Sequence, residues 1–232
     1  MPFWNLRGAS AAEALVRLTD ASIQNVSAGK VLEVAGEPTA YVYFVISGWL
    51  VSSKSTSDGQ RHIVDFILPG QFCDPGSARI TQTATDICAH TRAELAIMRR
   101  RDWSRLLERS PEFQTLVNRH VAARCSGMAE RMLRLGKANA ETRIAYAICE
   151  LCLRAHDTGP LNGQKFHLPL TQQALGDYVG LSSVHVSRTF CRFKQHDLVT
   201  ISDHMDIIIH DVDEFAAIAE VDIEALRAEI IA

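Results

Sequence analysis

The sequence predicts an α+β protein, with a β-rich first half, a long central helix and a C-terminal helix-turn-helix followed by a β-hairpin. Three observations predict this class. Short β-type runs separated by Gly and Pro fill residues 23–98. Apolar residues then recur at helical spacing over 113–135. The stretch LTQQALGDYVGLSSVHVSRTF at 170–190 has the caps and turn glycine of two helices that meet at an angle.

The composition is that of an ordinary folded protein. The chain of 232 residues is long enough for two domains, and 47% apolar with 22% charged residues excludes wholesale disorder. The net charge of −3 means that any positive charge that attracts nucleic acid must be local. No apolar run approaches the roughly 20 residues that span a bilayer, and the start, MPFWNLRGAS, does not read as a signal peptide. With only six scattered cysteines, we expect a cytoplasmic protein with reduced thiols and no membrane partner.

The first half is expected to form a small antiparallel sandwich or barrel. A short helix over 11–18 would begin at Ser10, with Glu13 at the capping-box position. Short strands at regular spacing favour antiparallel pairing over parallel βαβ units. The expected strands are VLEV (31–34), YVYFVI (41–46), WLVSS (49–53), HIVDFIL (62–68), ICAHT (87–91) and ELAIM (94–98).

The long helix is expected to be the seam of a dimer. One apolar stripe runs along it, made of Phe113, Leu116, Val117, His120, Val121, Cys125, Met128, Met132 and Leu135. A helix this long and apolar on one side needs more cover than a small sandwich provides, so a second copy of the chain would complete it. Packing of this helix on its own domain is the alternative. Another helix is expected over 141–156, with its apolar residues facing inward.

The stretch at 170–199 reads as a helix-turn-helix. Thr171 and Ser182 are good N-caps, Gly180 supplies the turn between the helices, and Leu181 fills the angle between them. The runs at 198–201 and 206–210 then read as a β-hairpin wing.

The second of these helices, 182–193, presents a face suited to the major groove of DNA. At about 100° per residue, Val186, Phe190 and Phe193 share an inward stripe, while the opposite side carries Val184, Arg188, Cys191 and Arg192. An Arg pairs with guanine through two hydrogen bonds, short side chains allow close approach, and an apolar group meets the thymine methyl. A ligand-binding module without DNA-binding function is the alternative. Such a module would not be expected to carry Arg188, Thr171 and the wing, and all three are present.

The chain resembles the cyclic-AMP receptor protein/FNR (CRP/FNR) family of bacterial transcription regulators over nearly its whole length. The resemblance rests on AGEP (35–38), YVYFVISGWL (41–50), DGQRHIVDFILPGQF (58–72), ICAHTRAELAIM (87–98) and the helix-turn-helix stretch. It implies an antiparallel β-roll sensor domain of the cyclic-nucleotide-binding type over 1–107, a dimerisation helix over 108–137, and a winged helix-turn-helix DNA-binding domain with C-terminal helices over 138–232. It also implies a homodimer on palindromic double-stranded DNA, with RNA polymerase as a partner if the protein is an activator.

The resemblance places DNA contacts on particular residues. The positions that read bases in the family fall on Ser183, Val184, Ser187 and Arg188. The contacts to the DNA backbone are expected from Thr171, Gln172, His185 and Arg192. Val184 stands where the family commonly has Glu. Because Val cannot accept a hydrogen bond from a cytosine or adenine amino group, we expect a half-site different from the usual one.

The sensor half departs from the members that bind a cyclic nucleotide. Pro75 stands where they carry the Glu that holds the ribose, and Thr83 where they carry the Arg that holds the phosphate. A buried phosphate without its Arg would be uncompensated, so cyclic AMP is not expected as the signal. The first cysteine is Cys73, whereas the iron–sulfur members carry a cysteine cluster near the N-terminus. A haem- or thiol-based redox sensor on the same fold is the alternative, although Pro75 also stands where haem-sensing relatives have His.

We expect no catalytic site, metal site or cofactor. Cys149 and Cys152 form a C-x-x-C on a helix, with no second pair nearby in sequence, and a core role is favoured. No HExxH or phosphate-binding Gly-rich motif is present. Cys191 is the candidate redox residue, because the neighbouring cations Arg188, Arg192 and Lys194 would favour a reactive thiolate. An incidental small residue at this position is the alternative.

Overall fold

The computed structural model describes residues 13, 15–18, 20–73, 82–155, 161, 163–202 and 205–231. The chain forms two compact units, Met1–Ala122 and Ala123–Ala232, and each is taken by itself below. Residues 13 and 15–18 are helical, as expected, while the predicted cap Ser10 lies outside the described residues.

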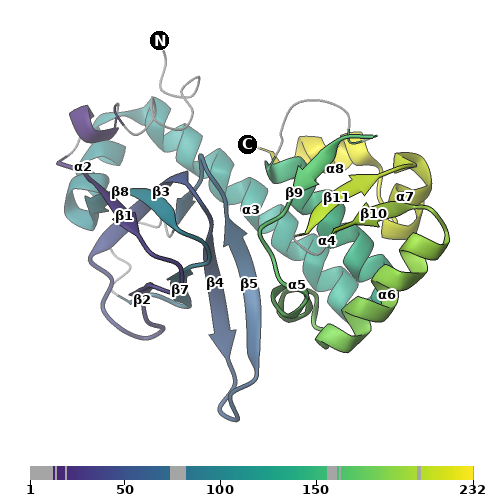
Figure 1. Ribbon diagram of the computed structural model, residues 1–232. Helices are drawn as coiled ribbons and strands as arrows, with labels where there is room; N and C mark the ends of the chain where they lie inside the picture. The colour runs from purple at the N-terminus through teal and green to yellow at the C-terminus, as the bar shows by residue number, and fades with distance from the viewer. Residues whose placement is uncertain are drawn as a thin grey trace. The chain divides into compact units, whose positions relative to one another are not determined.

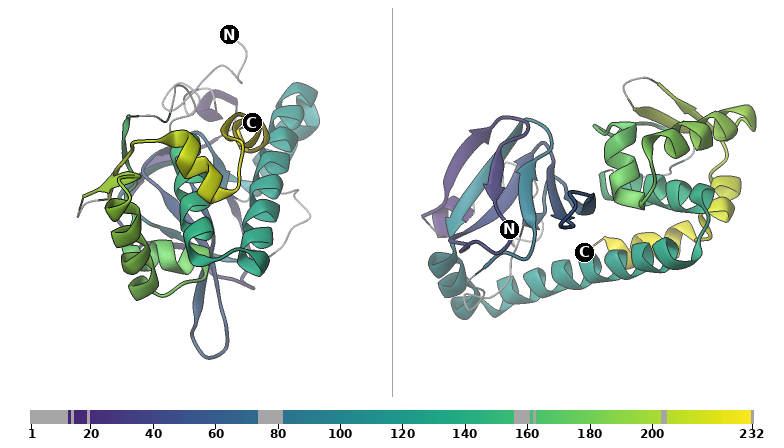
Figure 2. Two further views of the ribbon diagram at one scale, coloured as in Figure 1. Left: turned by 90° about the vertical axis from the view of Figure 1, so that its right-hand side faces the viewer. Right: turned by 90° about the horizontal axis from the view of Figure 1, so that it is seen from below.

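Two antiparallel sheets of four strands each make up the body of the first unit (Figures 1 and 2). Their strand orders are β1-β8-β3-β6 and β2-β7-β4-β5. The strands are β1 Ser22–Val26, β2 Val31–Glu33, β3 Tyr41–Ser47, β4 Leu50–Ser55, β5 Arg61–Ile67, β6 Phe72–Cys73, β7 Asp86–Ala89 and β8 Ala93–Arg99. The expected antiparallel sandwich is therefore confirmed. The pattern missed β1, whose Ile23 is exposed, and β6, which has only two residues.

An aromatic cluster joins the first unit's sheet to its helices. The Phe72 ring lies 5.0 Å from that of Trp103 in α2 (Arg100–Arg109), measured between centroids. It lies 6.1 Å from the ring of Phe113 and 6.0 Å from that of His120, both in α3 (Pro111–Lys137). The backbone N–H of Phe72 also donates to Nε2 of His120 at 3.4 Å. Phe72, the last residue of the stretch DGQRHIVDFILPGQF, is thus a packing point for the start of the long helix.

The apolar stripe of α3 is divided between two roles. Phe113 and Val117 are buried in the core of the first unit, so the expectation that the whole stripe faces a second copy is corrected. Their side chains cover the sandwich instead. Val121 and Met128 are each 39% exposed, and Met132 is 70% exposed. We call Val121, Cys125, Met128 and Met132 the apolar seam.

The second unit contains the remaining helices and a small sheet. Its helices beyond α3 are α4 Ala140–Ala155, α5 Gln172–Val179, α6 Ser183–Gln195, α7 Val212–Ala219 and α8 Ile223–Ile230. The sheet has the order β10-β11-β9, with strands β9 Lys165–His167, β10 Val199–Ile201 and β11 Asp206–Ile209. The predicted hairpin is β10 and β11. Strand β9 is an addition, because three residues, KFH, are too few to show a strand period.

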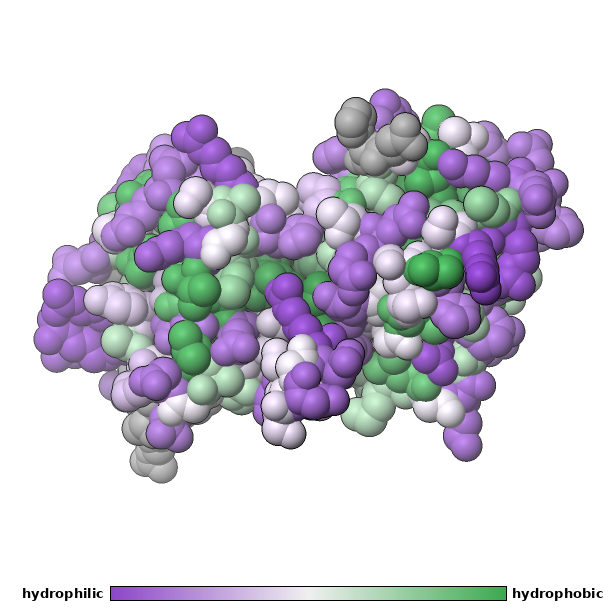
Figure 3. All heavy atoms as spheres, turned by 60° about the horizontal axis from the view of Figure 1, so that its bottom comes forward, coloured by the Kyte–Doolittle hydropathy of each residue, from purple (hydrophilic) through white to green (hydrophobic). Residues whose placement is uncertain are grey.

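The surface of the described chain is mixed in character. Hydrophilic and apolar residues are interspersed on the face drawn in Figure 3. Over the described residues, no helix has both the length and the apolar character needed to cross a membrane.

Candidate nucleic-acid interface

Helices α5 and α6 each begin directly after the residue predicted to cap them. Oγ1 of Thr171 accepts a hydrogen bond from the N–H of Ala174 at 3.0 Å, and Oγ of Ser182 accepts one from the N–H of His185 at 3.3 Å. Each cap satisfies a backbone donor that the first turn of a helix leaves free. The caps therefore fix where both helices start.

Two glycines set the angle between α5 and α6. Gly180 has a φ of 67°, in the left-handed region that often ends a helix and that glycine adopts most readily because it has no Cβ. A Cβ on Gly176 would lie 2.4 Å from the carbonyl oxygen of Leu181, so no side chain fits there. The sequence pattern identified Gly180 but not Gly176, whose importance arises from a contact with the chain after the turn.

The inward stripe of α6 is buried as expected. Val186, Phe190 and Phe193 are all buried, and the centroid of the Phe193 ring lies 5.4 Å from that of Phe215 in α7. This packing fixes the rotation of α6 about its own axis. It thereby decides which residues the helix presents outward.

The outward side of α6 carries the residues predicted to read bases. Val184 is 56% exposed, Arg188 is exposed, and Ser183 and Ser187 are half-buried. We call Ser183, Val184, Ser187 and Arg188 the reading face. The side chain of Arg188 is long and positively charged, and its neighbours on this face are short. A duplex can therefore approach the helix closely while Arg188 extends toward the bases.

The residues expected at the DNA backbone are also on the surface. Thr171 and Gln172 are exposed at the start of α5, where helix N–H groups favour an anion. His185 is exposed, and its Nδ1 lies 3.0 Å from Oγ of Ser182. Arg192 is exposed but is already paired with Glu141 of α4, which sequence reasoning missed because the two are far apart in the chain.

Strand β9 is joined to β11 of the wing by side-chain contacts. Asp206 of β11 lies 2.7 Å from Nζ of Lys165 and 2.8 Å from Nδ1 of His167, both in β9. The hydrogen bond from Lys165, and then that from His167, hold the pKa of Asp206 below its usual value. This carboxylate therefore stays charged and joins the added strand to the hairpin.

The cysteines differ in exposure: Cys73, Cys149 and Cys152 are buried, Cys88 is half-buried, and Cys125 and Cys191 are exposed. Cys149 and Cys152 are fully buried in α4, and burial raises the pKa of the Cys149 thiol to about 12 and that of Cys152 well above its usual value. Both thiols are therefore uncharged packing residues. Cys191 is exposed beside the reading face, and Cys125 is exposed on α3. Among the described residues, no group of three or more His, Cys, Asp or Glu is arranged to hold a metal ion.

Thr83, which the resemblance places where nucleotide-binding members have Arg, is part of the sandwich's own hydrogen bonding. It is buried, and its hydroxyl donates to the carbonyl of Thr85 at 3.0 Å. Its N–H donates to the carbonyl of Glu37 at 3.1 Å.

The buried carboxylate of Glu33 in the same sandwich accepts a hydrogen bond from the hydroxyl of Tyr43 at 2.7 Å. Pro75, the other expected departure, lies outside the described residues.

Two family profiles match the chain. The profile described as a cyclic nucleotide-binding domain matches residues 23–110, and that described as a Crp-like helix-turn-helix domain matches residues 142–218. The chain is 30% identical over 182 residues to the nitrogen fixation regulation protein FixK of Bradyrhizobium diazoefficiens. The matched region covers 75% of this chain and 73% of that protein. It is 29% identical over 200 residues to the transcriptional activator protein anr of Pseudomonas aeruginosa, covering 82% of this chain and 78% of that protein.

Solved structures share the architecture. FixK2 from Bradyrhizobium japonicum superposes with a TM-score of 0.73 at 24% identity, covering 87% of this chain and 98% of that chain. A CooA mutant from Carboxydothermus hydrogenoformans superposes with a TM-score of 0.74 at 15% identity, covering 89% of this chain and 94% of that chain. At such identities the likeness shows the fold alone.

Proposed function

We propose, from the premise that this chain belongs to the CRP/FNR family of DNA-binding transcription regulators and is not an enzyme, that it acts as a homodimer which reads a palindromic site through α6. The observation that carries the reading role is the exposed Arg188 among the short side chains of the reading face. An Arg in such a position forms two hydrogen bonds with guanine in the major groove. Val184 beside it suits a thymine methyl.

The contacts to the DNA backbone are assigned to Thr171, Gln172, His185 and Arg192. Thr171 and Gln172 stand at a helix N-terminus, which attracts phosphate by its free N–H groups. His185 and Arg192 border the reading face, where a helix in the groove meets the flanking strands. These contacts would supply affinity for any sequence, and the reading face would supply the choice of sequence.

Dimer formation is assigned to the apolar seam on α3. Its members are spaced by four, three and four residues, which is the spacing of a two-helix coiled coil. Two α6 helices related by a dyad would enter successive major grooves, with half-sites about one helical turn apart. We accordingly divide the chain by function into a sensor domain at 1–107, a dimerisation helix at 108–137 and a DNA-binding domain at 138–232.

The remaining partners follow from this role. The signal received by the β-roll is assigned to something other than cyclic AMP, because Thr83 offers the phosphate no positive charge. Relatives named transcriptional activators support RNA polymerase as a further partner, in the cytoplasm where the chromosome is accessible.

The test is the loss of discrimination in Arg188→Ala. A site is first selected from random duplex DNA with the wild-type protein, and gel-shift titration then compares that site with a scrambled one. Arg188→Ala is expected to lose about 1–3 kcal/mol per half-site on the selected DNA and little on the scrambled DNA. Arg192→Ala is the matched control, and it should weaken both duplexes alike. If Arg188→Ala still discriminates as the wild type does, the reading face has been assigned wrongly.

A further inference from the structure

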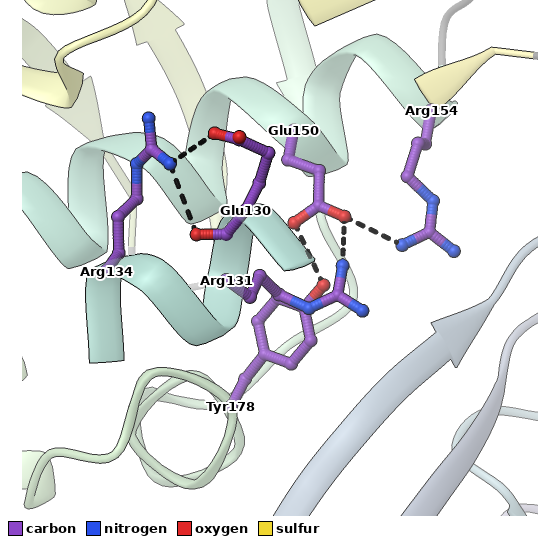
Figure 4. A network of polar contacts seen from close by, with 6 residues as sticks. All are labelled: Glu130, Arg131, Arg134, Glu150, Arg154 and Tyr178. Atoms are coloured by element: carbon purple, nitrogen blue, oxygen red, sulfur yellow. Dashed lines mark hydrogen bonds and ion pairs between the residues drawn. The ribbon is translucent and has the colours of Figure 1, made fainter. Parts of the chain in front are cut away.

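A buried carboxylate joins three helices of the second unit. Glu150 lies in the C-terminal half of α4 with 1% of its surface exposed. Its Oε1 accepts hydrogen bonds from Nη1 of Arg131 in α3 and, at 3.2 Å, from Nη1 of Arg154 in its own helix. Its Oε2 accepts one from the hydroxyl of Tyr178 in α5 at 3.0 Å (Figure 4). We call Arg131, Glu150, Arg154 and Tyr178 the Glu150 network.

Stability alone is a poor explanation for the Glu150 network. Burying ions is costly, and well-packed apolar residues often stabilise a fold equally well. Hydrogen bonds to a charged group instead have fixed directions and lengths, which apolar contacts lack. The guanidinium carbon of Arg131 also lies 5.0 Å from the centroid of the Tyr178 ring, so α3 and α5 are related to each other directly as well as through Glu150.

The network stands between the apolar seam and the reading face. Arg131 is buried, while Met128 and Met132, three residues before it and one residue after it, are exposed members of the seam. Tyr178 is in the last turn of α5, just before Gly180. A Cβ on Gly180 would lie 2.9 Å from Cδ2 of Leu135, so the turn itself also approaches α3 closely. Helix α5 in turn fixes α6 through the close contact at Gly176.

We propose that Glu150 is a positioning residue that sets the orientation of the helix-turn-helix against the seam segment of α3, and so makes the dimer selective for the spacing between half-sites. The inference rests on the proposed dimer and on reading through α6. In a dimer, the seam fixes the two α3 helices relative to each other. The Glu150 network then decides how far apart the two α6 helices stand.

The chain offers a matched pair of substitutions to test this. Tyr178→Phe removes the hydroxyl that donates to Glu150 and keeps the ring against Arg131. Tyr146→Phe is the control, because Tyr146 and Tyr178 are each 1% exposed and the ring of Tyr146 also lies against a guanidinium, that of Arg134 at 3.9 Å. The hydroxyl of Tyr146, however, has no hydrogen-bond partner among the described residues.

The measurement is binding to a series of duplexes whose two half-sites are separated by the selected distance or by one or two base pairs more or less. Fluorescence anisotropy gives the Kd for each, and thermal melts confirm that the variants are folded. Wild type and Tyr146→Phe are expected to bind the selected spacing far more tightly than the others. In Tyr178→Phe this preference should fall by about tenfold, the effect of losing one hydrogen bond to a charged group. Binding to a single half-site should be unchanged.

Glu150→Gln is a second variant that keeps the shape of the side chain and removes its charge, and it should flatten the spacing profile further. The inference is overturned if Tyr178→Phe keeps the wild-type spacing profile, whatever its melting temperature. The wild-type profile by itself tests the proposed dimer. A wild-type protein with no spacing preference would overturn the dimer proposal, and the present inference with it.

Discussion

Nη1 of Arg192 in α6 lies 3.0 Å from Oε1 of Glu141 in the first turn of α4. The two side chains are 52% and 39% exposed, and such an exposed ion pair contributes little to stability. Its significance lies in its position, because it places a carboxylate beside a cation that borders the reading face. On the proposed function, Glu141 competes with DNA phosphate for Arg192.

Glu141→Gln is therefore expected to raise the affinity for DNA of any sequence. Without the carboxylate, Arg192 reaches phosphate without first leaving an ion pair, so the plot of log K against log salt should steepen by up to about one unit, the effect of one full phosphate contact. Titrations of selected and scrambled duplexes at several salt concentrations measure this. Glu229→Gln in α8 removes one negative charge elsewhere. An equal gain in that variant would show that net charge, and not the pair with Arg192, is responsible.

The apolar seam predicts how the dimer can be broken. Val121→Glu and Met132→Glu each place a carboxylate where a partner helix would cover it, and a buried unpaired charge is very costly. Each should raise the dimer dissociation constant by about a hundredfold or more. Light scattering at micromolar concentration measures the mass. Arg119→Glu, about 160° around the helix from Val121, should leave the dimer intact. A wild-type monomer without DNA would contradict the assignment.

Cyclic AMP is expected not to bind. Thr83 provides no positive charge for the phosphate, and its hydroxyl and N–H are already used within the chain. Isothermal calorimetry should detect no heat of binding, and the nucleotide should not alter a gel shift. Micromolar affinity, or a shift that depends on the nucleotide, would show that other groups hold the phosphate.

Oxidation or alkylation of Cys191 is expected to weaken DNA binding while leaving the fold and the dimer intact. A sulfinate would place negative charge beside phosphates, and an alkyl group would add bulk where the duplex must approach. Peroxide treatment of wild type and Cys191→Ser, followed by binding assays, separates these effects. Cys88→Ser is the control, since Cys88 is half-buried in the sandwich and belongs to neither the reading face nor the apolar seam. If Cys191→Ser is as sensitive as the wild type, the responsible thiol is Cys73 or Cys125.

The features that the sequence predicted well are those determined by near neighbours. Thr171 and Ser182 cap helices through N–H groups three residues on, and Val186, Phe190 and Phe193 follow the period of one helix. Six of the eight strands of the sandwich were likewise predicted, whereas β1 and β6 were not.

The features that were missed depend on residues far apart in the chain. Glu141 and Arg192 are separated by 51 positions, and Glu150 and Tyr178 by 28. Gly176 matters only because Leu181 returns to it after the turn. The stripe on α3 is apolar except for His120, and its period does not reveal that Phe113 packs on the sandwich while Met132 stays exposed.

The reading face and the apolar seam lie on different helices, and on the proposed function this has a genetic consequence. A subunit with Arg188→Ala would keep its seam and pair with wild-type subunits. At equal expression only about a quarter of the dimers would carry two intact reading faces, because subunits combine at random. The altered allele would therefore be dominant in a strain that carries both copies. Combining it with Met132→Glu in the same subunit would restore the wild-type phenotype, because that subunit could no longer enter a mixed dimer.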